Sequence, residues 1–164
     1  MIWNVELLKG INGIEYGTSR DEVRKLIGLP YKEGHSVLDF GVYHDYFGDS
    51  CCVEYDCSFK MIAIEIYRRE IIYISGKKVF PGDISEYSEF VDDFVEDEDG
   101  YISRRKSVGL YLSNGKIESV TFGQKNYYDF IFTSDEKFSI FNESFLSEVS
   151  EKLDEEMKKD FRKL

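Results

Sequence analysis

The segment Lys60-Met61-Ile62-Ala63-Ile64-Glu65-Ile66 has a counterpart in Lys116-Ile117-Glu118-Ser119-Val120-Thr121-Phe122. Both segments are rich in β-branched and apolar residues, as strands are. Each follows another short strand-like run, residues 52–55 in the first copy and 108–112 in the second. A helix-like segment lies upstream of each hairpin. The sequence therefore predicts a doubled unit made of one helix and an antiparallel sheet.

Local signals mark the ends of the elements. Ser19 can cap a helix, and Glu22 is placed to close a capping box on it. Gly28 and Pro30 end that helix, because glycine tolerates a left-handed cap and proline cannot continue the helix. Asn114-Gly115 predicts a tight hairpin turn between the two strands of the second copy. Further strands are expected at residues 37–43, 51–55, 61–67, 71–74 and 127–132.

Two more helices follow from apolar spacing. A second helix is predicted from Ile84 to Phe94, with its apolar positions recurring at helical intervals. An amphipathic C-terminal helix is predicted from the stripe Leu146, Val149, Leu153, Met157, Phe161 and Leu164. We expect this helix to pack on the sheet or to form a dimer contact. The fold class is α+β, in one compact domain of residues 1–164, with two fused helix-plus-antiparallel-sheet units, 1–79 and 80–164, and the C-terminal helix.

Composition restricts the possible partners. The formal net charge is −11, which argues against nucleic acid and anionic membranes and favours a basic partner. An aromatic fraction of 16% supplies large side chains for a core. The start of the chain lacks the basic and apolar runs of a signal peptide, and three cysteines suit reduced thiols. We therefore expect a cytoplasmic protein, a monomer or weak dimer.

The strongest local charge feature lies between Asp83 and Asp99, where nine carboxylates occur without any Lys or Arg. Like charges four residues apart repel, so a purely structural helix would intersperse lysines. Three interpretations are open: a solvated face, a surface that steers a basic partner, or a calcium site, whose spacing does not match an EF-hand loop. The candidate partner-binding residues are Glu86, Glu89, Asp92, Asp93, Glu96, Asp97, Glu98 and Asp99, with Tyr101, Tyr127 and Tyr128 as aromatic anchors.

No catalytic or metal motif is found. His44 and Asp45 are adjacent on a predicted strand, so their side chains point to opposite faces and form a poor base-and-orienter pair. Cys51 and Cys52 alternate in the same way, and one of them is expected to pack as a small hydrophobe. A metal site from Cys51, Cys57 and His44 lacks zinc-ligand spacing. We predict no catalytic residue, no metal and no cofactor.

Residues 13–30 resemble the opening of a known repeat. Their sequence is Gly13-Ile14-Glu15-Tyr16-Gly17-Thr18-Ser19-Arg20-Asp21-Glu22-Val23-Arg24-Lys25-Leu26-Ile27-Gly28-Leu29-Pro30. The pattern Gly-x-Ser/Thr-x-x-Glu-Val-x-x-Leu-Leu-Gly-x-Pro begins the repeats of beta-lactamase inhibitor protein and of small outer-membrane assembly lipoproteins. The resemblance implies helical segments against an antiparallel sheet. The second copy departs from it, because the closing Gly-x-Pro is missing near residues 81–90.

In size, acidity, cytosolic start and repeat-like scaffold, the chain also resembles small acidic immunity proteins of bacterial polymorphic toxin systems, including contact-dependent growth inhibition. That resemblance implies binding and neutralisation of a cognate toxin domain, often a basic nuclease, without catalytic residues. Two alternatives stay open. A small-molecule-binding or sensor module would show a closed apolar, aromatic pocket. A hydrolase would show a cleft that brings His44 together with a carboxylate.

Overall fold

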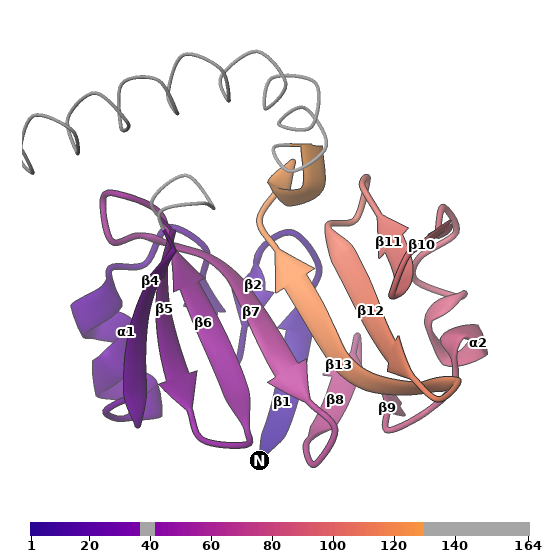
Figure 1. Ribbon diagram of the computed structural model, residues 1–164, viewed down its shortest axis with the longest axis horizontal. Helices are drawn as coiled ribbons and strands as arrows, with labels where there is room; N and C mark the ends of the chain where they lie inside the picture. Colours follow the sequence, from indigo (N-terminus) through magenta and orange to yellow (C-terminus); the bar gives the residue numbers. More distant parts are fainter. Residues whose placement is uncertain (37–41, 130–164) are drawn as a thin grey trace, which may run out of the picture. The chain divides into compact units, whose positions relative to one another are not determined.

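The computed structural model describes residues 1–36 and 42–129. These residues make up the compact unit Met1–Tyr128 together with Asp129, the first residue of a second unit, Asp129–Leu164. The described part is mostly β-sheet, in two sheets, with two short helices (Figure 1). It is compatible with the α+β class only in that broad sense. The predicted C-terminal helix, with its stripe from Leu146 to Leu164, lies outside the described residues.

The smaller sheet has five strands in the order β3-β2-β1-β8-β9. Its central strands β1 and β8 run parallel, with Trp3 opposite Ile72, and the other pairs are antiparallel. The strands are β1 (Ile2–Glu6), β2 (Gly10–Ile11), β3 (Ile14–Glu15), β8 (Ile71–Ile74) and β9 (Lys77–Phe80).

The larger sheet has eight antiparallel strands in the order β10-β11-β12-β13-β7-β6-β5-β4. They are β4 (Lys32–Ser36), β5 (Val42–Phe47), β6 (Cys51–Tyr55), β7 (Met61–Tyr67), β10 (Val95–Asp97), β11 (Gly100–Ser103), β12 (Val108–Ser113) and β13 (Lys116–Gly123). The strands expected at residues 51–55, 61–67 and 71–74 and the Asn114-Gly115 hairpin are confirmed, and Asn114 and Gly115 both have the positive φ that such a turn requires.

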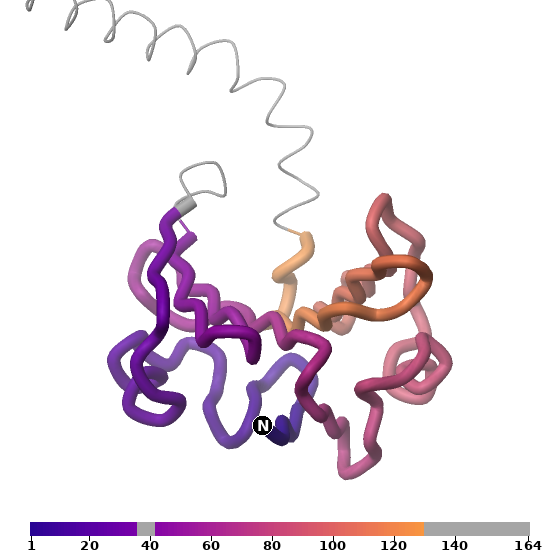
Figure 2. The backbone as a smooth tube through the Cα atoms, turned by 60° about the horizontal axis from the view of Figure 1, so that its bottom comes forward, coloured from indigo at the N-terminus to yellow at the C-terminus, as the bar shows by residue number. Residues whose placement is uncertain are grey.

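The two segments that are alike in sequence lie side by side at the centre of this sheet. β7 and β13 pair antiparallel, with Ile66 opposite Val120 and Ile64 opposite Phe122. Each is the last strand of a four-stranded meander that follows a helix, α1 (Arg20–Ile27) in one case and α2 (Ile84–Tyr87) in the other. Figure 2 shows both ends of the sheet bending to the same side, so its outer face is concave.

One apolar core joins the two sheets. Alternate strand residues point toward it and are fully buried, among them Trp3, Ile72, Ile64, Val120 and Phe122. The remaining positions of the eight-stranded sheet form its outer face. Since a strand exposes every second residue, the polar residues of β6, β7 and β13 gather there.

Helix α1 forms as its local signals predict. Ser19 and Glu22 form the capping box, and Gly28 ends the helix with φ of 117°. The helix is fastened to β5 by the fully buried carboxylate of Asp45, which accepts hydrogen bonds from Arg20 (2.5 Å) and Arg24 (2.7 Å). Burial alone would raise the pKa of Asp45, but the bonds from Arg24 and Arg20 hold it below its usual value.

Three expectations are wrong. The second helix ends at Tyr87 instead of Phe94, because Asp93 is bonded to Ser103 at the end of β11 and to Arg105 in the turn after it. Residues 91–94 have no regular secondary structure. The sequence predicts no strand between Phe94 and Gly100, but Val95–Asp97 form strand β10. Residues 127–129 form a helical turn and not the start of a strand at residues 127–132.

Candidate functional site

The structure divides the acidic segment into two parts, because α2 is only one turn long. A helix running on from Ile84 to Phe94 and beyond would place Glu86, Glu89, Asp93 and Glu96 on one side, but the short α2 does not align them. Glu86 lies on α2 and is half-buried. Glu89 lies beyond the helix and accepts a hydrogen bond from the ammonium of Lys77 at 2.6 Å.

Asp92 and Asp93 form ion pairs and hydrogen bonds with residues 103–105, at the end of β11 and in the turn before β12. Arg105 forms an ion pair with Asp92, and the hydrogen bond it donates lowers the pKa of that carboxyl. Asp93 accepts a hydrogen bond from the Ser103 hydroxyl (2.6 Å) and one from the Arg105 backbone N–H (3.2 Å). Arg105, in the basic cluster at residues 104–106, therefore offsets the charges of these two carboxylates.

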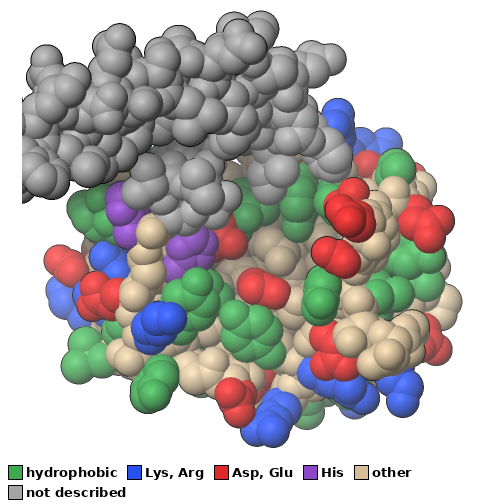
Figure 3. Space-filling model, viewed as in Figure 1, with side chains coloured by type: hydrophobic (Ala, Val, Ile, Leu, Met, Phe, Trp, Pro, Cys, Tyr) green, Lys and Arg blue, Asp and Glu red, His purple; other side chains and the backbone are tan. Residues whose placement is uncertain are grey.

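The other part of the segment is exposed. Glu96, Asp97, Glu98 and Asp99, which we call the acidic edge, lie on β10 and in the turn after it. β10 is the last strand of the eight-stranded sheet, and among the described strands it pairs only with β11. Within residues 1–36 and 42–129, no ion pair or side-chain hydrogen bond involves these four carboxylates. Figure 3 shows carboxylates gathered on this side of the molecule, over β10 and β11.

The three candidate tyrosines do not share one exposed surface. Tyr101 is half-buried and packs edge-on against Phe94, with a centroid distance of 6.5 Å. Tyr127 donates a hydrogen bond from its hydroxyl to Glu54 at 2.7 Å. Tyr128 is buried. Tyr127 and Tyr128 pack directly over Gly123 and Gly109, where an added Cβ would lie 2.5 Å and 2.0 Å from their atoms. Their role as interface anchors stays a prediction.

The placement of His44 and Asp45 on opposite faces is confirmed. Asp45 points under α1, whereas His44 lies on the outer face, directly opposite Glu54 of β6. Cys51 packs in the core as a small hydrophobe, and burial raises the pKa of its thiol to about 12. Cys57 is exposed. The described residues hold no group of three His, Cys, Asp or Glu side chains arranged to bind a metal ion.

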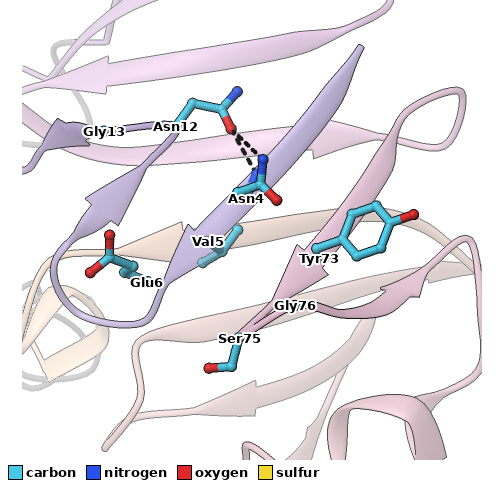
Figure 4. Close-up of a pocket in the computed structure, with 8 residues that line it drawn as sticks. All are labelled: Asn4, Val5, Glu6, Asn12, Gly13, Tyr73, Ser75 and Gly76. Carbon is cyan, nitrogen blue, oxygen red and sulfur yellow. Dashed lines mark hydrogen bonds between the residues drawn. The ribbon is translucent and has the colours of Figure 1, made fainter.

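A solvent-open hollow of about 460 Å³ lies on the five-stranded sheet (Figure 4). Its polar side chains are already engaged or point apart. The Asn12 side-chain oxygen accepts a hydrogen bond from the Asn4 backbone N–H (2.7 Å), and Glu6 accepts one from Lys9 (2.7 Å). In Figure 4, the Tyr73 ring points away from Glu6. This hollow is not the closed apolar pocket expected of a small-molecule sensor.

A second hollow, of about 430 Å³, lies on the outer face of the eight-stranded sheet. Its lining includes Glu65, Tyr67, Tyr111 and Ser119, none of which is among the residues predicted from the sequence to bind a partner. The sequence does indicate that two of them share a face. Side chains alternate along β7, so Glu65 and Tyr67 lie on the face opposite the buried Ile64 and Ile66. The cross-strand neighbours Tyr111 and Ser119 depend on strand pairing between segments far apart in sequence.

Among the helices of the described residues, none has the length and apolar character needed to cross a lipid bilayer. No protein-family model, curated protein or solved structure matches this chain.

Proposed function

We propose that this chain is a cytoplasmic, non-enzymatic immunity protein that binds and neutralises a basic toxin domain through the acidic edge. The observation that carries the proposal is the charge of Glu96, Asp97, Glu98 and Asp99, which no cation of the described residues offsets. A dense surface charge of one sign attracts a partner of the opposite sign and speeds encounter. A nuclease domain is basic where it grips nucleic acid, so the edge would compete for that surface.

The charges on β10 have a second explanation, which concerns the edge of the sheet. Natural sheets place charged residues on edge strands to prevent unwanted strand pairing, and β10 is such a strand. Charges on β10 itself suffice for that purpose, and Glu96 and Asp97 supply them. Glu98 and Asp99 lie beyond the strand, in the turn. The extension of the charge past the strand favours a partner-binding role.

The paired acids belong to the scaffold in this proposal. Glu89, Asp92 and Asp93 are held by Lys77 and Arg105, so their charges are offset locally. Inhibition is steric and electrostatic: the bound protein blocks the approach of the toxin's substrate. The proposal requires no chemistry from His44 or the cysteines.

The direct test uses the reading frame next to this gene. The C-terminal domain encoded directly upstream is placed under an inducible promoter in bacteria, alone or with this chain, and growth is recorded. We expect growth arrest that co-expression of this chain relieves. Arrest that persists despite full expression of the soluble chain would contradict the proposal, as would an upstream domain that is harmless when expressed alone.

A further inference from the structure

The hollow on the outer face of the eight-stranded sheet has a defined construction. Tyr67 of β7 and Tyr111 of β12 are the cross-strand neighbours of Ser119 on β13, one on each side. Adjacent strands lie about 4.8 Å apart, so the two tyrosines are separated by about 10 Å. The small Ser119 side chain between them leaves the space open. Tyr111 is 48% exposed and can meet a partner directly.

Glu65 provides the charge at this hollow. It points to the same face as Tyr67, two residues further along β7, and accepts a hydrogen bond from the Ser119 hydroxyl at 2.6 Å. Burial and then the charge of Glu65 raise the pKa of Tyr67, which agrees with their proximity. No Lys or Arg in the described part of the chain forms an ion pair with Glu65. Among residues 1–36 and 42–129, no contacting cation therefore offsets its negative charge.

The two arginines at the rim are already paired. Arg68 donates to Glu118 at 2.5 Å, and Arg69 donates to Asp49 at 2.8 Å. Figure 3 shows Lys and Arg side chains along the lower rim of this face, with carboxylates standing singly among hydrophobic and aromatic groups in its middle. Because both rim guanidiniums have carboxylate partners, the hollow does not offer a free cation to an anion.

We propose that this hollow, which we call the tyrosine hollow, binds an arginine side chain of the basic protein partner. A guanidinium is planar, stacks on aromatic rings and binds a carboxylate through two parallel hydrogen bonds. Tyr67 and Tyr111 supply the rings, and Glu65 supplies the carboxylate. The nature of the partner rests on the proposed function. The acidic edge would then govern the rate of association, whereas the tyrosine hollow would govern dissociation.

The test needs no knowledge of the partner. The isotope-labelled full chain is titrated with N-acetyl-arginine amide, and backbone amide shifts are followed by NMR. N-acetyl-citrulline amide serves as the neutral probe of nearly the same shape. We expect saturable shifts at Tyr67, Tyr111 and Ser119 with the arginine probe, and binding of the citrulline probe at least about tenfold weaker. Glu65→Gln should weaken arginine binding by at least about tenfold, and the control Glu15→Gln on β3 should leave it unchanged.

Several results would overturn the inference. They are equal binding of both probes, unchanged binding of the arginine probe by Glu65→Gln in a variant whose spectrum shows the native fold, and shifts that do not saturate. Each of these results would leave the acidic edge standing, because the probes test the hollow alone. Conversely, arginine binding in the hollow together with no growth rescue from the upstream domain would sink the proposed function and leave the hollow as a guanidinium site.

Discussion

The buried carboxylate of Asp45 allows a quantitative test of how α1 is held. Asp45 is 0% exposed and accepts paired hydrogen bonds from Arg20 and Arg24, whose side chains are 11% and 20% exposed. Asp45→Asn keeps the size of the side chain but leaves two nearly buried guanidiniums without their central counter-charge. Removing one partner of a buried ion pair costs about 3–5 kcal/mol. We expect a loss of about 3 kcal/mol, because both arginines keep Glu33 as a second partner.

Urea denaturation at pH 7 measures this loss, and Glu33→Gln is the matched control. Glu33 contacts the same two arginines at 3.0 and 3.1 Å, but its side chain is 58% exposed. An exposed pair contributes about 0–1 kcal/mol, so the control should change stability little. Equal effects of the two substitutions, or a loss below about 1 kcal/mol for Asp45→Asn, would refute the buried-carboxylate explanation.

The difference in stability between the native protein and Asp45→Asn should depend on pH. The folded pKa of Asp45 is lowered, so its contribution is complete above the unfolded pKa of about 3.9 and is lost as the pH falls toward the folded value. The difference in unfolding free energy between the native protein and Asp45→Asn should therefore shrink below about pH 4. A difference that stays constant from pH 7 to pH 3 would contradict this assignment.

Three further substitutions test local features by the same urea assay. Ser19→Ala removes one half of the capping box with Glu22 and should lower the free energy of unfolding by about 1 kcal/mol. No change would mean that the capping box does not stabilise α1. Gly109→Ala places a Cβ 2.0 Å from the Tyr128 hydroxyl oxygen and should cost about 1–3 kcal/mol, and unchanged stability would show that Tyr128 does not pack there. Gly115→Ala forces a side chain into a turn with φ of 72°, and should cost about 1 kcal/mol with no steric clash to relieve.

Elements with local signals could be predicted from the sequence. Ser19 and Gly28 bound α1, and Asn114-Gly115 joins β12 to β13, because capping and turn geometry depend on a few neighbouring residues. The central strands β7 and β13 were evident from their composition and similarity. Their pairing with each other joins residues more than fifty positions apart, and periodicity alone does not reveal it.

The predicted length of the second helix was wrong for a physical reason. Residues 84–94 carry a helical apolar period, and Tyr87 and Val91 are buried as that period requires. The chain nevertheless leaves the helix after one turn. Asp93 accepts hydrogen bonds from Ser103, the last residue of β11, and from Arg105 in the turn that follows. Repulsion among the carboxylates of this segment weakens its local preference for a helix. The hydrogen bonds of Asp93 therefore outweigh that preference.

The candidate site was predicted in part. The acidic run was visible as composition, but the sequence did not show which acids are paired within the fold. Lys77 lies on β9 and Arg105 lies between β11 and β12, so their pairing with Glu89 and Asp92 depends on tertiary structure. The tyrosine hollow was missed because Tyr67 and Tyr111 become neighbours of Ser119 only when three strands pair.

The most direct test of the proposed function is the association rate constant with the domain encoded directly upstream, if that domain arrests growth as the proposal requires. Glu96→Lys with Glu98→Lys on the acidic edge is compared with Glu15→Lys with Asp21→Lys, an equal charge change at exposed positions elsewhere. A change of about four charge units about 6 Å from a partner cation, in water of dielectric constant about 80 and screened over a Debye length of about 8 Å, amounts to about 1.3 kcal/mol. We predict about tenfold slower association and a weaker salt dependence for the edge variant only. Equal association rates for the edge variant, the control variant and the native protein would contradict the claim that the acidic edge meets the toxin.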